Sequence, residues 1–585
     1  RAAQAEALYQ EGKELRDAEQ YPAALEKFEA ALEIYRKLDD WSGQKRILNS
    51  MAQIHAKLEQ PETALEYFED LLVLVRELGE REEEGETLED IGDFLADQSR
   101  YPEALTYYQE ALAIFRDIGE RRDEAHTLVQ IGRVYYRQRQ HQEALEHHQQ
   151  ALAIFRELHD ESGEEYALTY MDWAYTGLGQ RQEMLAYYEE ALATRRTSRD
   201  REGEAEILKR MGDTYDGIGE YEQALAHYDE ALSIYRELGD SMRQDHVLSS
   251  LARVTKRLGQ PQEALAYYED LLALVRELDD KEEEGRTLRD IGDFLSDLFR
   301  YREAMTYYQD ALAIYRELGD REWEAIVLDK IGGVYQSLSR YPEALAHYEE
   351  SLAIDRELGD RETEATSLSN IGSVYQNLGQ YGEALAYYEE ALAIRREFDD
   401  RVGEARIFND IGGLYQDLGR YQEALDYHQE ALAISLEIID PPMEEASLLS
   451  IGNVYHSQGR FEEALQHYQE AMAIVQELGD QVEEGIALNN IGLIHDELGH
   501  YQEALKYYEG SLAIDRQLGR RAGEALTLTN IGEVYRVLGQ YQEAMAQHQE
   551  ALAIRREIGD RAGEGASLIG VGNVYWALEQ YQEAL

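Results

Sequence analysis

Histidines, clustered carboxylates and one glycine pair are the residues of this sequence that could support metal binding or catalysis. The 15 histidines never occur four residues apart with an acid between them, which is the helical spacing of a zinc-binding pair. No acidic run has the spacing of a calcium-binding EF-hand loop. Cysteine is absent, which removes thiolate nucleophiles and every Cys-based zinc site. We therefore expect no metal site and no cofactor.

The other candidates for chemistry have simpler structural interpretations. Gly570-Val571-Gly572 resembles part of a nucleotide-binding loop, but it lies within a helical pattern and no strand precedes it. The triple acids at 82–84 and 282–284 fall where helices should begin, so we expect them to be solvated. Three histidines stand where an aromatic residue recurs and are expected to pack in the core: His148, His428 and His548. We expect no catalytic residue and no enzyme activity.

Composition narrows the class of partner. The sequence has 57 Lys and Arg against 119 Asp and Glu, a formal charge of −62. So acidic a chain repels nucleic-acid phosphates and anionic membranes, and we expect neither as a partner. No stretch approaches the roughly 20 consecutive apolar residues that span a bilayer, and the N-terminus has no apolar signal core. The absence of cysteine fits a reducing compartment, and we expect a cytoplasmic protein.

The elements that must position any site come from a repeat of 40 residues. From residue 1 the sequence divides into 14 complete blocks (1–560) and a truncated block (561–585), without insertion or deletion. A fixed period of this length is the signature of a solenoid, in which each unit buries its apolar face only against its neighbours. We therefore predict that residues 1–585 form a single continuous array.

Each block contains two helical patterns. In block ten, apolar residues recur at helical spacing in 368–375 and again in 384–394. Asp360 stands at an N-cap position, and Gly379 stands where a residue after a helix end adopts positive φ. The second helix is predicted to begin at Tyr381. At about 17 residues each, the helices would be roughly 25 Å long.

Small and aromatic residues at fixed places indicate how the two helices pack. In block ten, Gly372 is expected to face Ala384 so that the backbones approach closely, and Ala391 to leave room for the next block. Tyr375 and Tyr388 are expected to fill the spaces between helices. In order and spacing these positions resemble the tetratricopeptide repeat family. The 40-residue unit is similar to the repeats of kinesin light chain, of Pins-type polarity adaptors and of arrays attached to bacterial signalling proteins, although the family's usual Pro after the second helix is missing.

The resemblance implies an all-α fold, an α-α superhelix or solenoid of about 14.5 helical hairpins with a right-handed course. It also implies that first helices line a concave wall, where four positions per block face the groove. Over 15 blocks these 60 positions carry 11 acids and 10 bases, so the wall is nearly neutral although the whole chain is not. The acidity is therefore predicted to lie on the convex side and in the loops, where it favours solubility.

The expected groove is not uniform along the chain. Blocks four, six and seven place five bases there, which would suit an acidic peptide, with scattered solvated charges as the alternative: Arg133, Lys209, Arg210, Arg253 and Lys256. Blocks ten to fourteen place amides there: Asn370, Asn409, Asn453, Asn489, Asn490 and Asn530. Asn370, Asn490 and Asn530 directly precede an Ile-Gly pair. In the similar arrays this place is often Asn, which implies hydrogen bonds to a peptide backbone, since an amide is both donor and acceptor.

Two further irregularities stand out from the 40-residue pattern. In block five, Asp172 replaces the small Gly and Met184 the small Ala. Tyr170 and Trp173 would project into the groove there as a binding hot spot, or the block is a local packing defect. In addition, residues 81–100 closely resemble residues 281–300, and we predict an internal duplication of 1–200 as 201–400.

The sequence therefore predicts a protein-interaction scaffold whose groove holds an extended or helical segment of a protein or peptide partner. We expect it to be the sensor or docking part of a larger bacterial signalling protein. The chain begins without Met and its last residues, 581–585, open a helical pattern that stops, which also indicates a piece of a longer protein. The alternative is structural self-assembly, because solenoid ends expose apolar faces that could join copies into a homo-oligomer.

Overall fold

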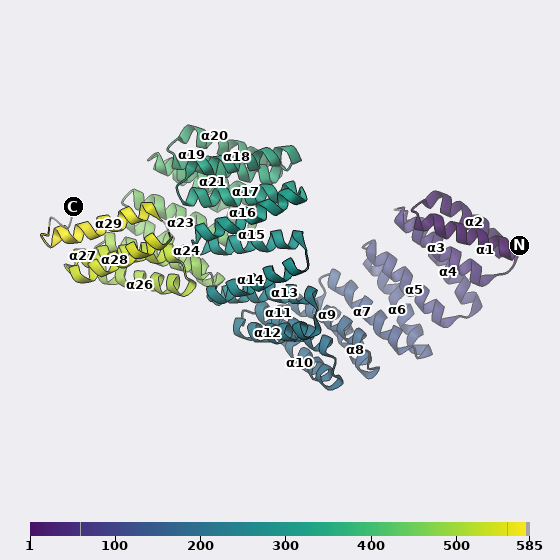
Figure 1. The fold of residues 1–585 in the computed structure, drawn as a ribbon. Coiled ribbons are helices and arrows are strands. Elements are labelled where there is room, and N and C mark those ends of the chain that lie inside the picture. The colour runs from purple at the N-terminus through teal and green to yellow at the C-terminus, as the bar shows by residue number, and fades with distance from the viewer. Residues whose placement is uncertain (59, 559, 581–585) are drawn as a thin grey trace. The chain divides into compact units, whose positions relative to one another are not determined.

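The chain is an all-helical solenoid of hairpins. The computed structural model describes residues 1–58, 60–558 and 560–580, and every regular element in them is an α-helix. The chain divides into two units, Arg1–His227 and Tyr228–Leu585, and the boundary falls within α12 (Tyr221–Leu238). In each unit the helices alternate as the first and second arms of hairpins that stack on one another (Figure 1). This arrangement confirms the predicted all-α solenoid of helical hairpins.

The first helices of the hairpins carry odd numbers. They are α1 (Ala2–Asp17), α3 (Trp41–Lys57), α5 (Arg81–Asp97), α7 (Arg121–Arg137), α9 (Glu161–Leu178), α11 (Arg201–Gly217), α13 (Ser241–Arg257), α15 (Lys281–Asp297), α17 (Arg321–Ser337), α19 (Arg361–Asn377), α21 (Arg401–Asp417), α23 (Pro441–Ser457), α25 (Gln481–Glu497), α27 (Arg521–Val537) and α29 (Arg561–Ala577). Their regular 40-residue spacing matches the sequence repeat.

The second helices carry even numbers. Besides α12, they are α2 (Tyr21–Lys37), α4 (Pro61–Leu78), α6 (Tyr101–Ile118), α8 (His141–Glu157), α10 (Arg181–Ser198), α14 (Pro261–Glu277), α16 (Tyr301–Leu318), α18 (Tyr341–Leu358), α20 (Tyr381–Glu397), α22 (Tyr421–Ile438), α24 (Phe461–Leu478), α26 (Tyr501–Leu518) and α28 (Tyr541–Ile558). Both α19 and α20 have 17 residues, the length predicted for block ten.

Local sequence sets where each helix begins and ends. Asp360 accepts hydrogen bonds from the backbone N–H groups of Glu362 and Thr363, both at 3.1 Å, and so caps α19 as predicted. Gly379 follows the end of α19 with φ +72°, the left-handed conformation that glycine adopts without a Cβ clash. The next helix, α20, begins at Tyr381, as the sequence indicated.

Most hairpin cores are built on a glycine packed against an aromatic ring. A Cβ added to Gly372 would lie 2.8 Å from Cε1 of Tyr388 and 3.3 Å from the carbonyl oxygen of Ala384. The predicted approach of Gly372 to Ala384 is thus confirmed, although the ring of Tyr388 is closer still. Tyr388 is 1% exposed, and tyrosines at the same place in other hairpins are equally buried: Tyr108, Tyr188, Tyr228, Tyr308, Tyr468 and Tyr508. These tyrosines are core residues, as predicted.

Successive hairpins are joined by a recurring ionic contact, which we call the clamp. Between α18 and α19, Nε of Arg356 lies 2.8 Å from Oε1 of Glu364, and Arg361 pairs with the other carboxylate oxygen. Glu364 is only 3% exposed. Burial alone would raise the pKa of Glu364, but the hydrogen bonds from the two arginines outweigh it and lower that pKa.

The clamp recurs in other joints where one base lies eight residues before the buried glutamate and a second base lies three residues before it. Such clamps lie in the joints α4–α5, α6–α7, α10–α11, α14–α15, α16–α17, α20–α21 and α26–α27. The acids at 82–84 and 282–284 were expected to be solvated, but Glu84 and Glu284 are only 7% and 6% exposed and take part in clamps. Their pairing with two bases ties each second helix to the next hairpin.

Candidate functional site

The first helices form the more crowded side of the stack. Within each unit the more extensive contacts between non-consecutive described helices all join first helices, for example α5 with α7, α7 with α9, α21 with α23 and α27 with α29. In a curved stack the elements on the inner side are closer together. This crowding supports the assignment of the first helices to the concave side, and we call their solvent-facing surface the inner wall.

Polar side chains bridge neighbouring first helices along the inner wall. Nε2 of Gln336 on α17 donates to Oγ of Ser373 on α19 (2.9 Å). Nε2 of Gln376 on α19 donates to Oδ2 of Asp417 on α21 (2.7 Å). Ser373 and Gln376 were predicted groove positions, and they also serve to hold adjacent hairpins in register. Part of the polar inner wall is therefore structural.

Acidic side chains crowd the inner wall of α5 in unit 1. Oη of Tyr108 donates to Oδ1 of Asp93 (2.5 Å), and Oγ1 of Thr127 donates to Oε1 of Glu89 (3.2 Å). Burial, with repulsion from Asp93, raises the pKa of Glu89 to about 8. Burial likewise raises the pKa of Asp90 to about 6. Near neutral pH this wall is therefore less negative than its sequence suggests.

An aromatic patch covers the inner wall of α9 and extends onto α7. The ring of Tyr170 lies 4.9 Å from that of Trp173 and 5.0 Å from that of Tyr166, edge-on in both pairs. Cζ of Arg133 lies 5.4 Å from the centre of the Tyr170 ring. Trp173 is 45% exposed and also approaches Tyr136, at 6.1 Å. The structure thus brings together the predicted residues Arg133, Tyr170 and Trp173. Tyr136 and Tyr166 were not predicted, although Tyr166 lies one helical turn before Tyr170.

The hairpin that carries this patch is also irregularly packed. α9 and α10 touch along a much shorter length than the arms of the α7–α8 or α15–α16 hairpins. Met184 is fully buried where other hairpins have Ala, and Asp172 replaces the glycine that allows close approach. Burial raises the pKa of Asp172. The packing irregularity and the exposed aromatic patch therefore occur in the same hairpin.

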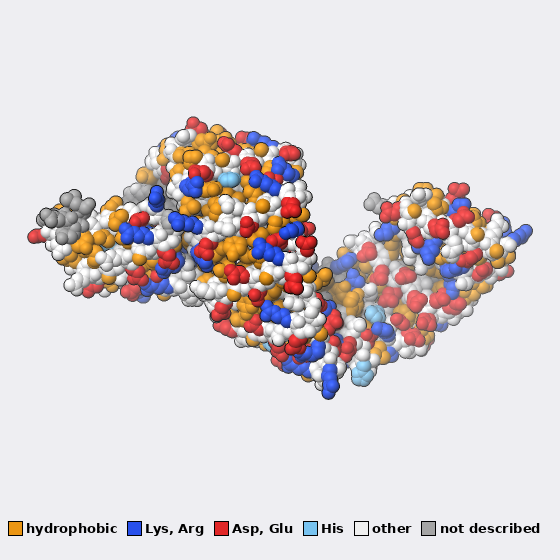
Figure 2. All heavy atoms as spheres, viewed as in Figure 1, with side chains coloured by type: hydrophobic (Ala, Val, Ile, Leu, Met, Phe, Trp, Pro, Cys, Tyr) orange, Lys and Arg blue, Asp and Glu red, His pale blue; other side chains and the backbone are white. Residues whose placement is uncertain are grey.

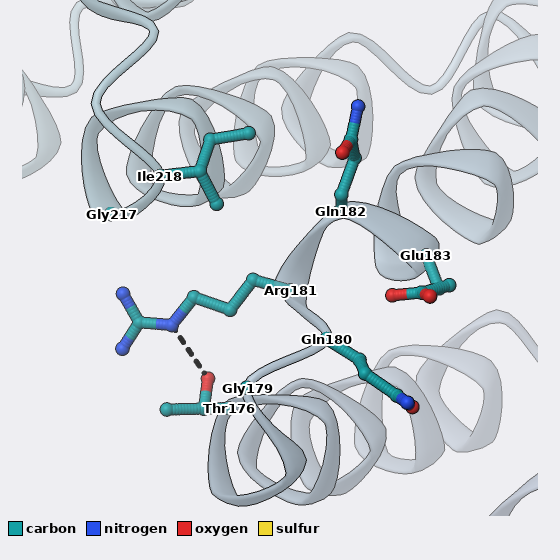
Figure 3. Close-up of a pocket in the computed structure, with 8 residues that line it drawn as sticks. All are labelled: Thr176, Gly179, Gln180, Arg181, Gln182, Glu183, Gly217 and Ile218. Carbon is teal, nitrogen blue, oxygen red and sulfur yellow. Dashed lines mark hydrogen bonds between the residues drawn. The ribbon is translucent and has the colours of Figure 1, made fainter.

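A pocket of about 620 Å³ opens at the turn of this hairpin. It is lined by Thr176, residues 179–183, Gly217 and Ile218, all in unit 1. In Figure 3, Arg181 extends between the end of α9 and the end of α11, and its Nε donates to Oγ1 of Thr176 (3.0 Å). A Cβ on Gly217 would lie 2.1 Å from Nη1 of Arg181, so any other residue there would displace the guanidinium. Arg181 thus fills part of this hollow and braces the open hairpin.

Three of the five predicted basic residues are paired with acids. Salt bridges join Lys209 to Asp213 (3.1 Å), Arg210 to Glu206 (3.0 Å) and Lys256 to Asp297 (2.7 Å). Arg133 lies over the aromatic patch of unit 1, and Arg253 is exposed on α13 in unit 2. The pairing favours the alternative of solvated charges over a seat for an acidic peptide, because little unpaired positive charge remains.

Two of the six predicted asparagines hydrogen-bond to side chains of second helices. Nδ2 of Asn409 donates to Oγ of Ser447 (3.0 Å), and its Oδ1 lies 2.9 Å from Nδ1 of His428. Oδ1 of Asn453 accepts a hydrogen bond from Oη of Tyr468 (2.6 Å). These amides anchor second helices to first helices, so their capacity to bind a partner is reduced.

The other four asparagines offer more to a partner. Nδ2 of Asn530 donates to Oδ1 of Asn489 (3.1 Å), which leaves the second N–H and the oxygen of Asn530 available. Asn370 and Asn490 are half-buried on the inner wall, and among the described residues their side-chain amides make no hydrogen bond. Asn370, Asn490 and Asn530 occupy the same place on α19, α25 and α27.

The three histidines at the recurring aromatic place are buried in the hairpin cores. His148, His428 and His548 are at most 2% exposed, as their predicted packing role requires. Burial lowers the pKa of His148 to about 3 and that of His428 to about 4, so both are neutral at pH 7. Within the described residues no group of three or more His, Asp or Glu could hold a metal ion.

The surface and the helices bear on the predicted partner classes. Figure 2 shows acidic and basic side chains interspersed over the face in view, with no large area of one sign. No helix in the described ranges is long and apolar enough to cross a membrane. The surface therefore offers polar contacts of both signs to a partner.

Several solved structures are similar to parts of the chain. BtubC (BKLC) from P. vanneervenii is 24% identical, with 38% of this chain and 92% of that chain covered and a TM-score of 0.33. RapI in its apo form is 20% identical over 47% of this chain and 99% of that chain, with a TM-score of 0.39. A STAND protein with a tetratricopeptide repeat sensor from Pyrococcus horikoshii is 16% identical over 58% of this chain and 51% of that chain, with a TM-score of 0.37. At these scores the likeness carries no conclusion about function.

Family models give the decisive comparison. A search of curated proteins found no match. A tetratricopeptide repeat model matches residues 2–77, 83–157, 174–237, 244–317, 290–357, 363–437, 444–517 and 523–585. A second tetratricopeptide repeat model matches residues 409–477. Since these matches cover most of its length, the chain belongs to the tetratricopeptide repeat family.

Proposed function

We propose that this array is a protein-binding scaffold whose inner wall in unit 2 holds an extended segment of a partner protein. The observation that carries the proposal is the row of amides at one place on three first helices: Asn370, Asn490 and Asn530. Their side chains keep hydrogen-bonding capacity that the protein itself does not use. An extended peptide presents unpaired N–H and C=O groups, and each amide can satisfy one of each.

The charge of this wall suits a peptide of low net charge. Oγ of Ser369 donates to Asp410 (3.1 Å), and burial raises the pKa of Asp410 to about 6. Burial also raises the pKa of Asp496 to about 6. Glu533 is neutralised by Arg536, whose Nε lies 2.9 Å from Oε2 of the carboxylate. Few unpaired charges remain on this wall, so backbone recognition should contribute more than charge steering.

The test is peptide binding to a double amide variant. Peptides would be selected from a displayed random library against the whole chain and titrated by fluorescence polarisation. In Asn490→Ala/Asn530→Ala we expect at least a tenfold weaker affinity, because two backbone-binding groups are removed. The matched control is Asn377→Ala, since Asn377 is exposed at the end of α19 and bonds only the carbonyl of Ser373 among the described residues. Equal affinities for both variants would refute binding at the amide row.

We also propose that the scaffold acts as the sensor or docking part of a larger cytoplasmic signalling protein of bacteria. Support comes from the uninterrupted 40-residue repeat and the absence of cysteine, which fits a reducing compartment. Sequencing the complete gene checks this: an adjoining effector domain such as an NTPase is expected. A complete reading frame that encodes the repeat array alone would contradict it.

Self-assembly is a second candidate, favoured by the exposed face of α29. Ile569 and Trp576 are 66% and 67% exposed, and Leu568 is 45% exposed on the same helix. Stacking with another copy would bury these side chains. Light scattering over a concentration series would show dimers that disappear in Ile569→Glu/Trp576→Glu. A monomer at every concentration would eliminate this candidate.

A further inference from the structure

A cavity in unit 2 lies where two distant stretches of the chain meet. The turn between α13 and α14 approaches the end of α26: a Cβ on Gly259 would lie 3.2 Å from the carbonyl oxygen of Gln517. Likewise, a Cβ on Gly519 would lie 3.3 Å from Cγ of Pro261 (Figure 1). The cavity between these stretches has a volume of about 540 Å³. This size is in the range of small-molecule sites, roughly 300–1,000 Å³.

The walls of this cavity are largely apolar, and its bases are paired. The apolar lining consists of Pro261, Phe294, Leu298, Phe299, Val482 and Leu518. Nζ of Lys256 lies 2.7 Å from Oδ2 of Asp297. Nη1 of Arg520 lies 3.1 Å from Oδ1 of Asp515 and 3.3 Å from the carbonyl oxygen of Val482. An anionic ligand would have to displace an acid from its base, whereas an uncharged one would not.

Burial distinguishes the lining from the same places elsewhere in the repeat. Leu298 is 8% exposed, whereas the equivalent Leu378 and Leu418 are each 41% exposed. Leu518 is half-buried, whereas the equivalent Leu358 is 47% exposed. The chain therefore covers these two leucines more than the equivalent Leu378, Leu418 and Leu358.

Two residues at the cavity depart from local preferences that most blocks of the repeat follow. Phe299 has φ +59°, a left-handed conformation that disfavours a bulky side chain; Gly379 and Ser99 occupy the equivalent places in blocks ten and three. Arg520 stands at the N-cap of α27, and its side chain makes no capping hydrogen bond. At the equivalent place in block ten, Asp360 caps α19. The two residues meet here, with Cζ of Arg520 5.8 Å from the centre of the Phe299 ring.

We propose that this cavity is a binding site for an uncharged aromatic or branched aliphatic small molecule. The ligand would contact Phe294, Leu298 and Leu518 and thereby hold the α13–α16 stretch against α25–α27. Phe299 and Arg520 form the wall at the cost of local helix-end stability, which is typical of residues kept for a site. This site is separate from the amide row of the inner wall, and its ligand is not a peptide backbone.

The test uses the neutral fluorescent probe N-phenyl-1-naphthylamine with the whole chain. We expect saturable binding at one site and at least tenfold weaker binding in Leu298→Gln/Phe299→Ser, which installs the residues of block three, Gln98 and Ser99. The matched control is Leu378→Gln/Gly379→Ser, the same pair of residues at the exposed turn of block ten, and it should bind like the wild type. The sulfonated analogue 1-anilinonaphthalene-8-sulfonate should bind at least tenfold more weakly than the neutral probe.

A second variant tests whether a loss of probe binding could result from misfolding. Arg520→Asp restores the cap residue of α27, so it should keep the helix content seen by circular dichroism while weakening probe binding. Wild-type affinity in both Leu298→Gln/Phe299→Ser and Arg520→Asp would overturn the site, as would the lack of saturable binding to the wild type. Tighter binding of the sulfonated analogue would overturn its assignment to uncharged ligands.

Discussion

The joints between hairpins in unit 2 differ in whether a buried glutamate is held by two bases. The joints α16–α17, α18–α19 and α20–α21 contain the buried glutamate held by two arginines. In the α22–α23 joint, Leu436 and Pro441 stand where those arginines would be. In the α24–α25 joint, Gln476 and Gln481 replace them, and Glu484 receives only a 3.3 Å hydrogen bond from Gln476. We call these two joints open.

The open joints adjoin first helices that carry the amides. Asn453 lies on α23, and Asn489 and Asn490 lie on α25. Segments that bind partners are commonly drawn from the less stable parts of a fold, because they must adjust to what they bind. Clamps therefore reinforce the joints that precede Asn370 on α19 and Asn530 on α27, whereas the two open joints precede Asn453, Asn489 and Asn490.

The largest expected effect is the loss of one clamp. Glu364→Ala removes the carboxylate between Arg356 and Arg361, whose side chains are 48% and 42% exposed and can be solvated. We therefore expect a local destabilisation of about 2 kcal/mol, below the 3–5 kcal/mol typical of a fully buried pair. Glu484→Ala at an open joint should cost about 0.5 kcal/mol or less. Native-state hydrogen exchange of peptides from α18–α19 and α24–α25 measures both.

Hydrogen exchange is the suitable readout because a solenoid of this length need not unfold in one step. The control is Glu362→Ala, which removes a first-turn carboxylate of α19 whose side chain is 85% exposed. Equal losses of protection in Glu364→Ala and Glu484→Ala would show that the clamp has no special role.

The clamp also shows where sequence reasoning ends. The period of 40 predicted the helices, their caps and the glycine–tyrosine core, because these depend on short-range pattern. The pairing of Glu364 with Arg356 was missed, although the bases sit at fixed intervals, because helical periodicity says nothing about contacts between successive hairpins. The cavity at Phe299 and Arg520 depends on residues about 220 positions apart, and only their departure from the local pattern signals it. The amide row could be identified from sequence, but which amides were already bonded could not.

The second expected effect is an opposite response of the two kinds of joint to pH. In the open α22–α23 joint, burial, with smaller contributions from Glu483 and Asp480, raises the pKa of Glu445 from 4.5 to about 7. The pKa of Glu445 is higher in the folded state than in the unfolded state. The stability that its protonated form contributes is therefore fully present below pH 4.5 and is lost as pH rises through 7. We expect α22–α23 to gain about 1–2 kcal/mol of protection between pH 8 and pH 5.5.

The clamped α18–α19 joint should lose stability only when the pH falls, not when it rises. The pKa of Glu364 is lowered, so its stability is present above pH 4.5 and is lost only as pH falls through its folded value. Exchange rates corrected for their intrinsic pH dependence should therefore stay constant for α18–α19 over pH 5.5–8. Glu445→Gln is the matched control and should remove the response of α22–α23. A persistent response in that variant would assign it to another group.

The smallest expected effect comes from closing an open joint. Gln476→Arg/Gln481→Arg places two bases around Glu484 at the spacing that Arg356 and Arg361 have around Glu364. We expect a gain of about 0.5–1 kcal/mol in the protection of α24–α25, because the new bases stay partly solvated. Hydrogen exchange measures the gain, and the same change with Gln481 left intact serves as the half-clamp control.

Closing this joint also tests why it is open. If α24–α25 adjusts when a peptide binds beside Asn490, the added clamp should weaken peptide affinity several-fold while leaving the amides in place, because the bound arrangement must then break an ion pair. If the wall is already in its binding arrangement, affinity should stay the same or rise. Fluorescence polarisation with a selected peptide separates these outcomes. An unchanged affinity together with greater protection would mean that the open joints tolerate binding without being required for it.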